Sequence, residues 1–142
     1  FINGLEEGKT YILSETVSPE GYVKSIDIEF NVSKDKVDQK VTMKDKQVFI
    51  SKTDVGGEEV TGAYMQIIDE NGNVVDEWYS EGKSHIANGL EEGKTYTLHE
   101  DLAPIGLNLA NDIVFAVTEE KENQKVEMVD TINEVSKCVA KS

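Results

Sequence analysis

The amino-acid sequence predicts an all-β protein made of antiparallel β-sandwich domains in tandem. Short apolar stretches alternate with polar residues at a period of two, which is the pattern of half-buried strands, and glycine- and asparagine-rich turns separate them. The sequence also repeats itself at a spacing that is too long for one turn of a solenoid and matches a small domain. We therefore expect successive domains, each with its own core.

The repeat has a period of 85 residues, since this shift places Asn3–Tyr11 over Asn88–Tyr96 without a mismatch. The match continues without a gap to the end of the chain. It divides the sequence into the C-terminal half of a preceding repeat, residues 1–47, one complete repeat, 48–131, and the first strand of a following repeat, 132–142. We expect an excerpt from a longer array, in which the neighbouring repeats of the same chain are partners.

Within the complete repeat, the alternation predicts strands that contain Val48 and Ile50, Tyr96 and Leu98, Ile113 to Val117, and Val126 and Met128. Several short strands with regular turns are typical of a sandwich. The pair Asn71-Gly72 predicts a tight hairpin. Asp69–Asn73 superficially resembles a calcium loop, but its glycine comes too early and the closing glutamate is absent, so we expect only a turn.

Composition excludes several classes of function. The 142 residues carry a formal net charge of −14, which repels nucleic acid and anionic lipid. No run of about 18 apolar residues could span a bilayer, and the first residues do not resemble a signal peptide. Cys138 is the single cysteine, so no internal disulfide forms, and His85 and His99 do not complete a zinc-ligand pattern. We expect no metal and no cofactor.

Three ionisable residues continue the apolar alternation and should face the core. Lys52 follows Val48 and Ile50, Glu100 follows Tyr96 and Leu98, and Asp130 follows Val126 and Met128. The partial copies keep the pattern at three equivalent positions, which are Glu15, Asp45 and Lys137. Charged groups are almost never buried unpaired, so the lysine and the two carboxyls of the complete repeat should compensate one another.

Such a cluster permits two interpretations. Burial favours a neutral amine and a protonated acid, so Lys52 could attack Asp130 and form an amide while Glu100 moves protons. The alternative is a buried salt-bridge cluster in which no bond forms. The residues alone leave both open.

The same residues carry a resemblance to the Cna B-type domains, the B-type repeats of collagen-binding surface proteins of Gram-positive bacteria, which also occur in pilins and adhesins. The motifs lie in both halves of the complete repeat: Phe49–Asp54, Gly62-Ala63, Thr95–Glu100 with Ala103–Gly106, and Val126–Asp130. The resemblance implies an immunoglobulin-like or prealbumin-like sandwich and an isopeptide bond between Lys52 and Asp130, assisted by Glu100. In the third copy Cys138 replaces Thr53, so no bond is predicted for Lys137.

The leading hypothesis is a structural stalk of an adhesin or pilus on the bacterial surface, anchored through regions outside this segment and not an enzyme that turns over. A second hypothesis is an adhesive module that binds a host protein or glycan through the loop 79–88 or an exposed aromatic patch at Trp78. A hydrolase that uses Glu100 and Asp130 is a third. We expect Trp78 to belong to the core, and His85 and His99 to face solvent.

Overall fold

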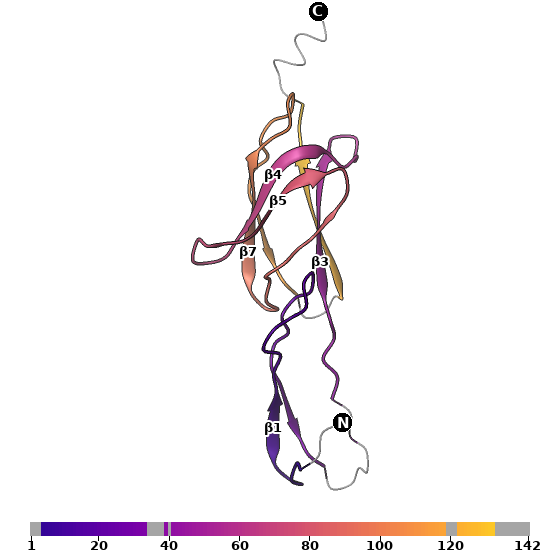
Figure 1. Ribbon diagram of the computed structural model, residues 1–142, viewed down its shortest axis with the longest axis vertical. Helices are drawn as coiled ribbons and strands as arrows, with labels where there is room; N and C mark the ends of the chain where they lie inside the picture. Colours follow the sequence, from indigo (N-terminus) through magenta and orange to yellow (C-terminus); the bar gives the residue numbers. More distant parts are fainter. Residues whose placement is uncertain (1–3, 34–38, 40, 119–121, 133–142) are drawn as a thin grey trace, which may run out of the picture.

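The computed structural model describes residues 4–33, 39, 41–118 and 122–132. In these ranges all regular secondary structure is β-strand (Figure 1). No helix of the described residues is long and apolar enough to cross a membrane. The expectation of an all-β protein is confirmed.

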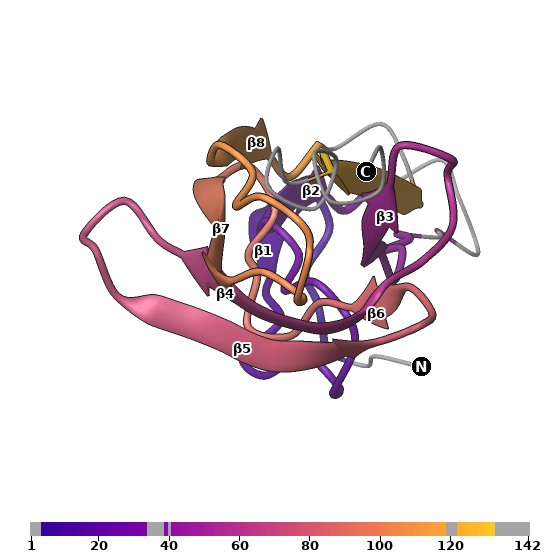
Figure 2. The same cartoon turned by 90° about the horizontal axis from the view of Figure 1, so that it is seen from above.

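The second copy of the repeat, residues 48–131, forms two sheets that face each other. One sheet has four antiparallel strands in the order β5 (Val74–Glu81), β4 (Thr61–Ile68), β7 (Thr95–Leu102) and β8 (Ile113–Ala116). The other has three strands in the order β6 (His85–Ile86), β3 (Gln47–Asp54) and β9 (Asn123–Asp130). Figure 2 shows β7 and β8 on one side of the molecule and β3 on the other.

The core fills the space between the two sheets. Its buried side chains include the predicted positions Val48, Ile50, Tyr96, Leu98, Phe115, Val126 and Met128, and β4 adds Met65 and Ile67. Trp78 packs against this cluster from β5, as expected for a core aromatic. The period of two therefore identifies the inner faces of β3, β7 and β9 correctly.

One pairing differs from the antiparallel expectation. β3 and β9, the first and last strands of the second copy, are parallel, and Gln47 to Asp54 pair with Asn123 to Asp130 in unbroken register. Parallel neighbours need a long connection between them, and here the rest of the domain provides it. Both strands consequently run in the same direction, from the end that adjoins the first copy toward the opposite end (Figure 1).

The hairpin between β4 and β5 confirms the predicted turn. The amide of Asp69 donates to the carbonyl of Asn73 at 2.9 Å, and Gly72 adopts a φ of 85°, which glycine accepts without strain. The Asp69 carboxylate accepts hydrogen bonds from the amides of Asn71 and Asn73, both at 2.9 Å. The bond from Asn73 contributes most to lowering the pKa of Asp69 below its usual value. This carboxylate therefore stabilises the turn through its hydrogen bonds to the backbone.

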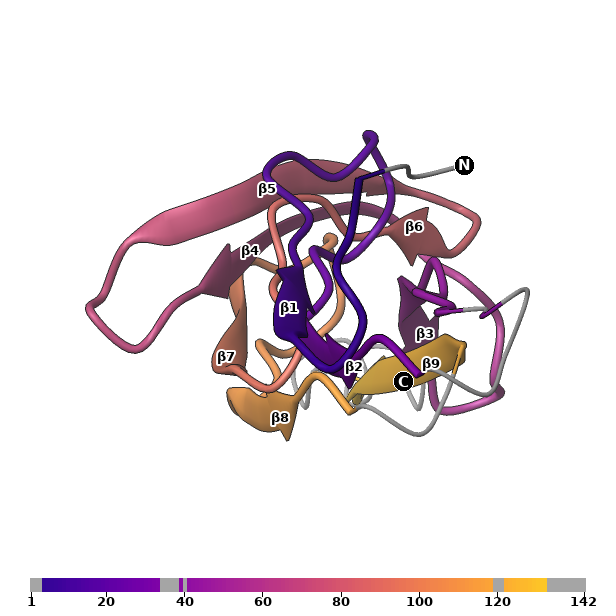
Figure 3. The same ribbon diagram turned by 90° about the horizontal axis from the view of Figure 1, so that it is seen from below.

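The first copy, of which residues 4–33, 39 and 41–47 are described, contributes one antiparallel pair, β1 (Thr10–Leu13) with β2 (Ile28–Asn31). Its chain reaches the end of the sandwich, where Val23 bridges Lys46 and Lys24 bridges Glu91. Figure 3 shows β1 and β2 lying over that end of the sandwich. The chain then enters β3 directly at Gln47.

Candidate functional site

Three charged side chains meet inside the sandwich of the second copy. Lys52 lies on β3, Glu100 on β7 and Asp130 on β9, and their side chains are 2%, 0% and 0% exposed. The Nζ atom of Lys52 forms an ion pair and hydrogen bond with Oδ1 of Asp130 and lies 3.4 Å from Oε2 of Glu100. The structure thus brings together the three residues that the alternation places on the inner face.

The sheet pairing explains how these residues meet. On the parallel strands Lys52 pairs with Met128, so Asp130 stands two residues further along β9 and on the same face. Lys52 Nζ also lies 3.4 Å from the carbonyl of Met128. Glu100, which pairs with Met65 on β4, approaches from the opposite sheet. The amine therefore lies between two carboxyls, one on its own sheet and one across the core.

A backbone amide holds the Glu100 side chain. Oε1 of Glu100 accepts a hydrogen bond of 2.9 Å from the amide of Ala110. The other oxygen, Oε2, and Oδ2 of Asp130 are buried and accept no hydrogen bond from the described residues. Burial of Oε2 without a hydrogen-bond donor disfavours the ionised form of Glu100, and the charge of Lys52, 3.4 Å away, opposes this effect.

The pKa of Glu100 agrees with this geometry. Burial raises the pKa to about 7, and the neighbouring Asp130 adds to the increase, whereas the Ala110 amide and the Lys52 charge oppose it. A carboxyl with a pKa near 7 can give and take back a proton at physiological pH. Glu100 therefore has the properties of a general acid, and its neighbours are an amine and a carboxyl in contact.

The first copy retains only part of this arrangement. Oε1 of Glu15 accepts a hydrogen bond of 3.0 Å from the amide of Ser25, which reproduces the Glu100 contact at the equivalent position. Asp45 is exposed, and no lysine-bearing strand pairs with β1 or β2 in the described part of the chain. Among the described residues, Glu15 and Asp45 are thus not brought together with a lysine. Lys137 and Cys138 lie outside the described residues.

The histidines lie elsewhere. We expected His85 to face solvent, but it is half-buried. Its ring stacks on that of Trp78 with centroids 3.8 Å apart, and its Nε2 lies 2.8 Å from Oδ2 of Asp76. His99 lies on the outer face of β7, and the hydrogen bond to Asp112 is the main cause that raises its pKa. Among the described residues no group of three or more His, Cys, Asp or Glu side chains could hold a metal ion.

The aromatic region at β5 combines buried and exposed rings. Tyr79 is 58% exposed and packs on Tyr64 with ring centroids 4.7 Å apart. A shallow hollow of about 370 Å³ lies beside it, lined by Trp78, Tyr79, Glu81, Lys83, Ser84 and His85. Trp78 is covered by His85 and the core, so the exposed aromatic ring of this region is that of Tyr79.

The sequence matches the model of a protein family, the SpaA prealbumin-like fold domain, twice, over residues 1–47 and 46–132. The chain belongs to this family. The two matches together cover the candidate site and the first copy. The family and the all-strand structure establish a prealbumin-like fold, so the resemblance to Cna B-type domains is confirmed. The sequence has no detectable relative among curated proteins.

Solved structures show the same fold. The shaft pilin SpaA of Lactobacillus rhamnosus GG superposes with a TM-score of 0.52 at 18% identity, over 87% of this chain and 64% of the pilin. The TIE protein of Bacillus anthracis gives a TM-score of 0.50 at 23% identity, over 87% of this chain and 25% of that protein. A variant of BcpA, the major pilin subunit of Bacillus cereus, gives 0.50 at 21%, over 60% and 28%. This chain therefore spans just under two thirds of the shaft pilin.

Proposed function

We propose that this chain is a structural segment of a stalk, an adhesin or a pilus shaft, on the surface of a Gram-positive bacterium, and that an amide between Lys52 and Asp130 closes its second copy. Membership of the prealbumin-like family supports the stalk. The single observation that carries the bond is the contact of Lys52 with Asp130 beside a buried Glu100 of raised pKa. The stalk is extracellular, and its immediate partners are the neighbouring domains of the same protein.

The bond forms without any external reagent. The neutral amine of Lys52 attacks the carboxyl carbon of Asp130, and the new C–N bond replaces the C–OH bond of the acid. Glu100 donates a proton to the departing hydroxyl group, which leaves as water, and recovers a proton from the amine nitrogen. Glu100 therefore ends in its starting form, and the amide remains as a permanent product after one event.

The same burial argues against hydrolysis of a substrate by Glu100 and Asp130. Both carboxyl side chains are 0% exposed, and the groups around them are the core residues of the sandwich. A hydrolase would need to admit a substrate and water to its paired carboxyls. Here the amine that faces the carboxyls belongs to the chain itself.

The test is the intact mass of the purified protein. We expect a mass lower than the sequence mass by one water, and a fragment spectrum that joins the Lys52 and Asp130 peptides. Lys52→Arg should restore the full mass. Lys46→Arg is the matched control, because Lys46 is also a buried lysine in contact with a carboxylate, Glu92, and its replacement should leave the loss of water unchanged. A wild-type mass equal to that of the sequence would rule out the bond.

A further inference from the structure

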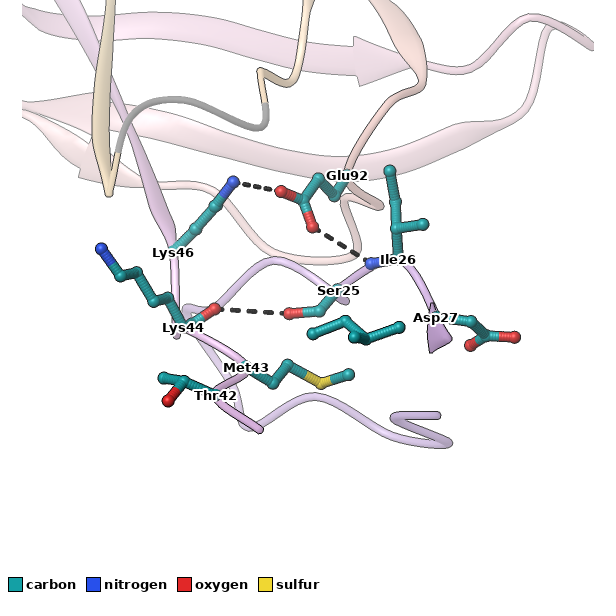
Figure 4. A pocket seen from close by; sticks show the side chains of 9 residues that line it. Ser25, Ile26, Asp27, Thr42, Met43, Lys44, Lys46 and Glu92 are labelled. Carbon is teal, nitrogen blue, oxygen red and sulfur yellow. Dashed lines mark hydrogen bonds and ion pairs between the residues drawn. The ribbon is translucent and has the colours of Figure 1, made fainter. Parts of the chain in front are cut away.

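The motif that is identical in the two copies has a structural role that the cross-link does not explain. In the second copy this motif, Asn88–Tyr96, contains the loop on which the end of the first copy lies. Figure 4 shows Lys46 and Glu92, one from each side of this contact, pointing toward one another beside Ser25 and Ile26. We call the segment Asn88–Gly93 the socket, and residues 21–26 together with Lys46 the plug.

Backbone groups hold the plug in the socket. The amide of Lys24 donates to the carbonyl of Leu90 at 2.9 Å, and the amide of Glu92 donates to the carbonyl of Lys24 at 2.8 Å. The amide of Gly21 donates to the side-chain oxygen of Asn88 at 2.6 Å. These bonds fix the position of the plug, but they depend little on its side chains.

Charged groups add selectivity. Oε1 of Glu92 is paired with Nζ of Lys46, and their side chains are only 9% and 8% exposed. Oε2 of Glu92 accepts a hydrogen bond of 3.1 Å from the amide of Ile26, and Lys46 also donates to the carbonyl of Thr118 at 3.2 Å. A buried carboxylate without a cation would be strongly unfavourable. The socket therefore requires a cation at the position of Lys46.

A glycine allows the close approach of the plug. Gly93 has a φ of 83°, and a Cβ atom there would lie 3.1 Å from Cδ1 of Ile26. Glycine at this position thus leaves room for the Ile26 side chain and accepts the positive φ. The asparagine, the glutamate and the glycine of the motif all contact the plug, which gives a physical reason for their presence.

We propose that the motif Asn88–Tyr96 is a docking site for the end of a preceding domain of the same family, and that it selects an end which carries a lysine at the position of Lys46. The other end of the second copy does not meet this requirement. The repeat period places Leu109 where the plug has Lys24, and Thr131 where it has Lys46. The two ends are therefore not interchangeable, and the residues at these positions determine which domain end can precede the socket.

Amide hydrogen exchange on the whole chain tests the proposal. The reporters are the amides of Lys24 and Glu92, whose bonds cross the contact between backbone groups. Glu92→Gln keeps the size of the side chain and removes its charge, and Lys46→Thr introduces the residue found at the far end. Each should speed exchange at both reporters by about tenfold or more, since the contact then opens more often. The double variant Lys46→Glu with Glu92→Lys restores an ion pair but leaves the amide of Ile26 and the carbonyl of Thr118 without their partners, so it should recover only part of the protection.

Glu7→Gln is the matched control, because Glu7 occupies the position of Glu92 in the first copy and is exposed. It should leave the reporters unchanged. Exchange within about twofold of wild type in both Glu92→Gln and Lys46→Thr, or an equal loss of protection in Glu7→Gln, would overturn the proposal. The amides of Leu98 and Met128 report whether the core stays folded. The intact mass reports the Lys52 bond separately, so this proposal and the proposed function can fail independently.

Discussion

Lys52 and Asp130 stand on adjacent parallel strands with an offset of two residues, because Lys52 pairs with Met128 while Asp130 pairs with Asp54. The offset leaves both side chains on the inner face and lets the long lysine side chain reach forward along β9. The two residues are 78 positions apart in the sequence. An amide between them would close nearly the whole second copy into a ring.

Replacement of Glu100 by glutamine should separate folding from the reaction. Glutamine keeps the shape of the side chain and an oxygen for the Ala110 amide, so the sandwich should form. It cannot supply the proton that the departing hydroxyl group needs. We expect a folded protein with the full sequence mass, measured by circular dichroism and mass spectrometry. A loss of one water in this variant would remove Glu100 from the mechanism.

The rate of bond formation should depend on the protonation of Glu100. Because its pKa is raised to about 7, the acid form prevails below this pH and disappears above it. We expect the rate to fall as pH rises through 7, measured by mass spectrometry at set times after refolding. A rate that increases steadily through this range would indicate that loss of a proton from Lys52 limits the reaction instead.

His99 should stabilise the fold only in acid. The hydrogen bond to Asp112 raises its pKa, so the favourable contact is complete below the unfolded value of 6.5 and is lost as pH rises through the folded pKa. The side chain is 33% exposed and therefore partly screened by solvent. We expect His99→Gln to lower the free energy of unfolding by about 0.5 kcal/mol near pH 5.5 and by almost nothing near pH 8.5. Urea denaturation at both pH values measures this difference.

Mechanical extension should reveal the ring directly. Tension that enters at Gln47 and leaves after Asp130 would pass along β3 to Lys52 and through the amide, so the residues between them would carry no load. By the loop-entropy estimate for a cross-link of this span, the closure stabilises the fold by about 4.5 kcal/mol. We expect Asp130→Ala to release roughly 260 Å of extra contour in single-molecule pulling, and the wild-type domain to release none of it. Equal extension of the two proteins would contradict the stalk proposal.

The sequence predicts the inner face of the sandwich better than its connections. Alternation places Lys52, Glu100 and Asp130 inside because every second side chain of a strand shares a face. It cannot show strand direction, so the parallel pairing of β3 with β9 was missed. Alternation also does not show whether another strand packs over a given position. Asp45 has the same parity as Asp130, yet it is exposed because no lysine-bearing strand lies beside it in the described residues.

Other features lack a signal in the pattern. The Ala110 amide that holds Glu100 is a backbone group, and every residue except proline has one. The pair of Lys46 and Glu92 lies in a connection and a loop, where no period applies. Glu92 lies in the segment Asn88–Tyr96, which is identical to Asn3–Tyr11. This identity indicates that the segment is needed, but it does not show which residues the segment contacts.

The parallel direction of β3 and β9 has a geometric consequence for the length of an array. The chain enters the second copy at one end and leaves it at the other (Figure 1). Strands of eight residues cover about 26 Å, so every domain added in this way moves the tip of the protein outward by at least that distance. If the entry and exit strands were antiparallel, the chain would return to its starting end and successive domains would sit side by side. The parallel topology thus makes the distance that an array spans increase with the number of its domains.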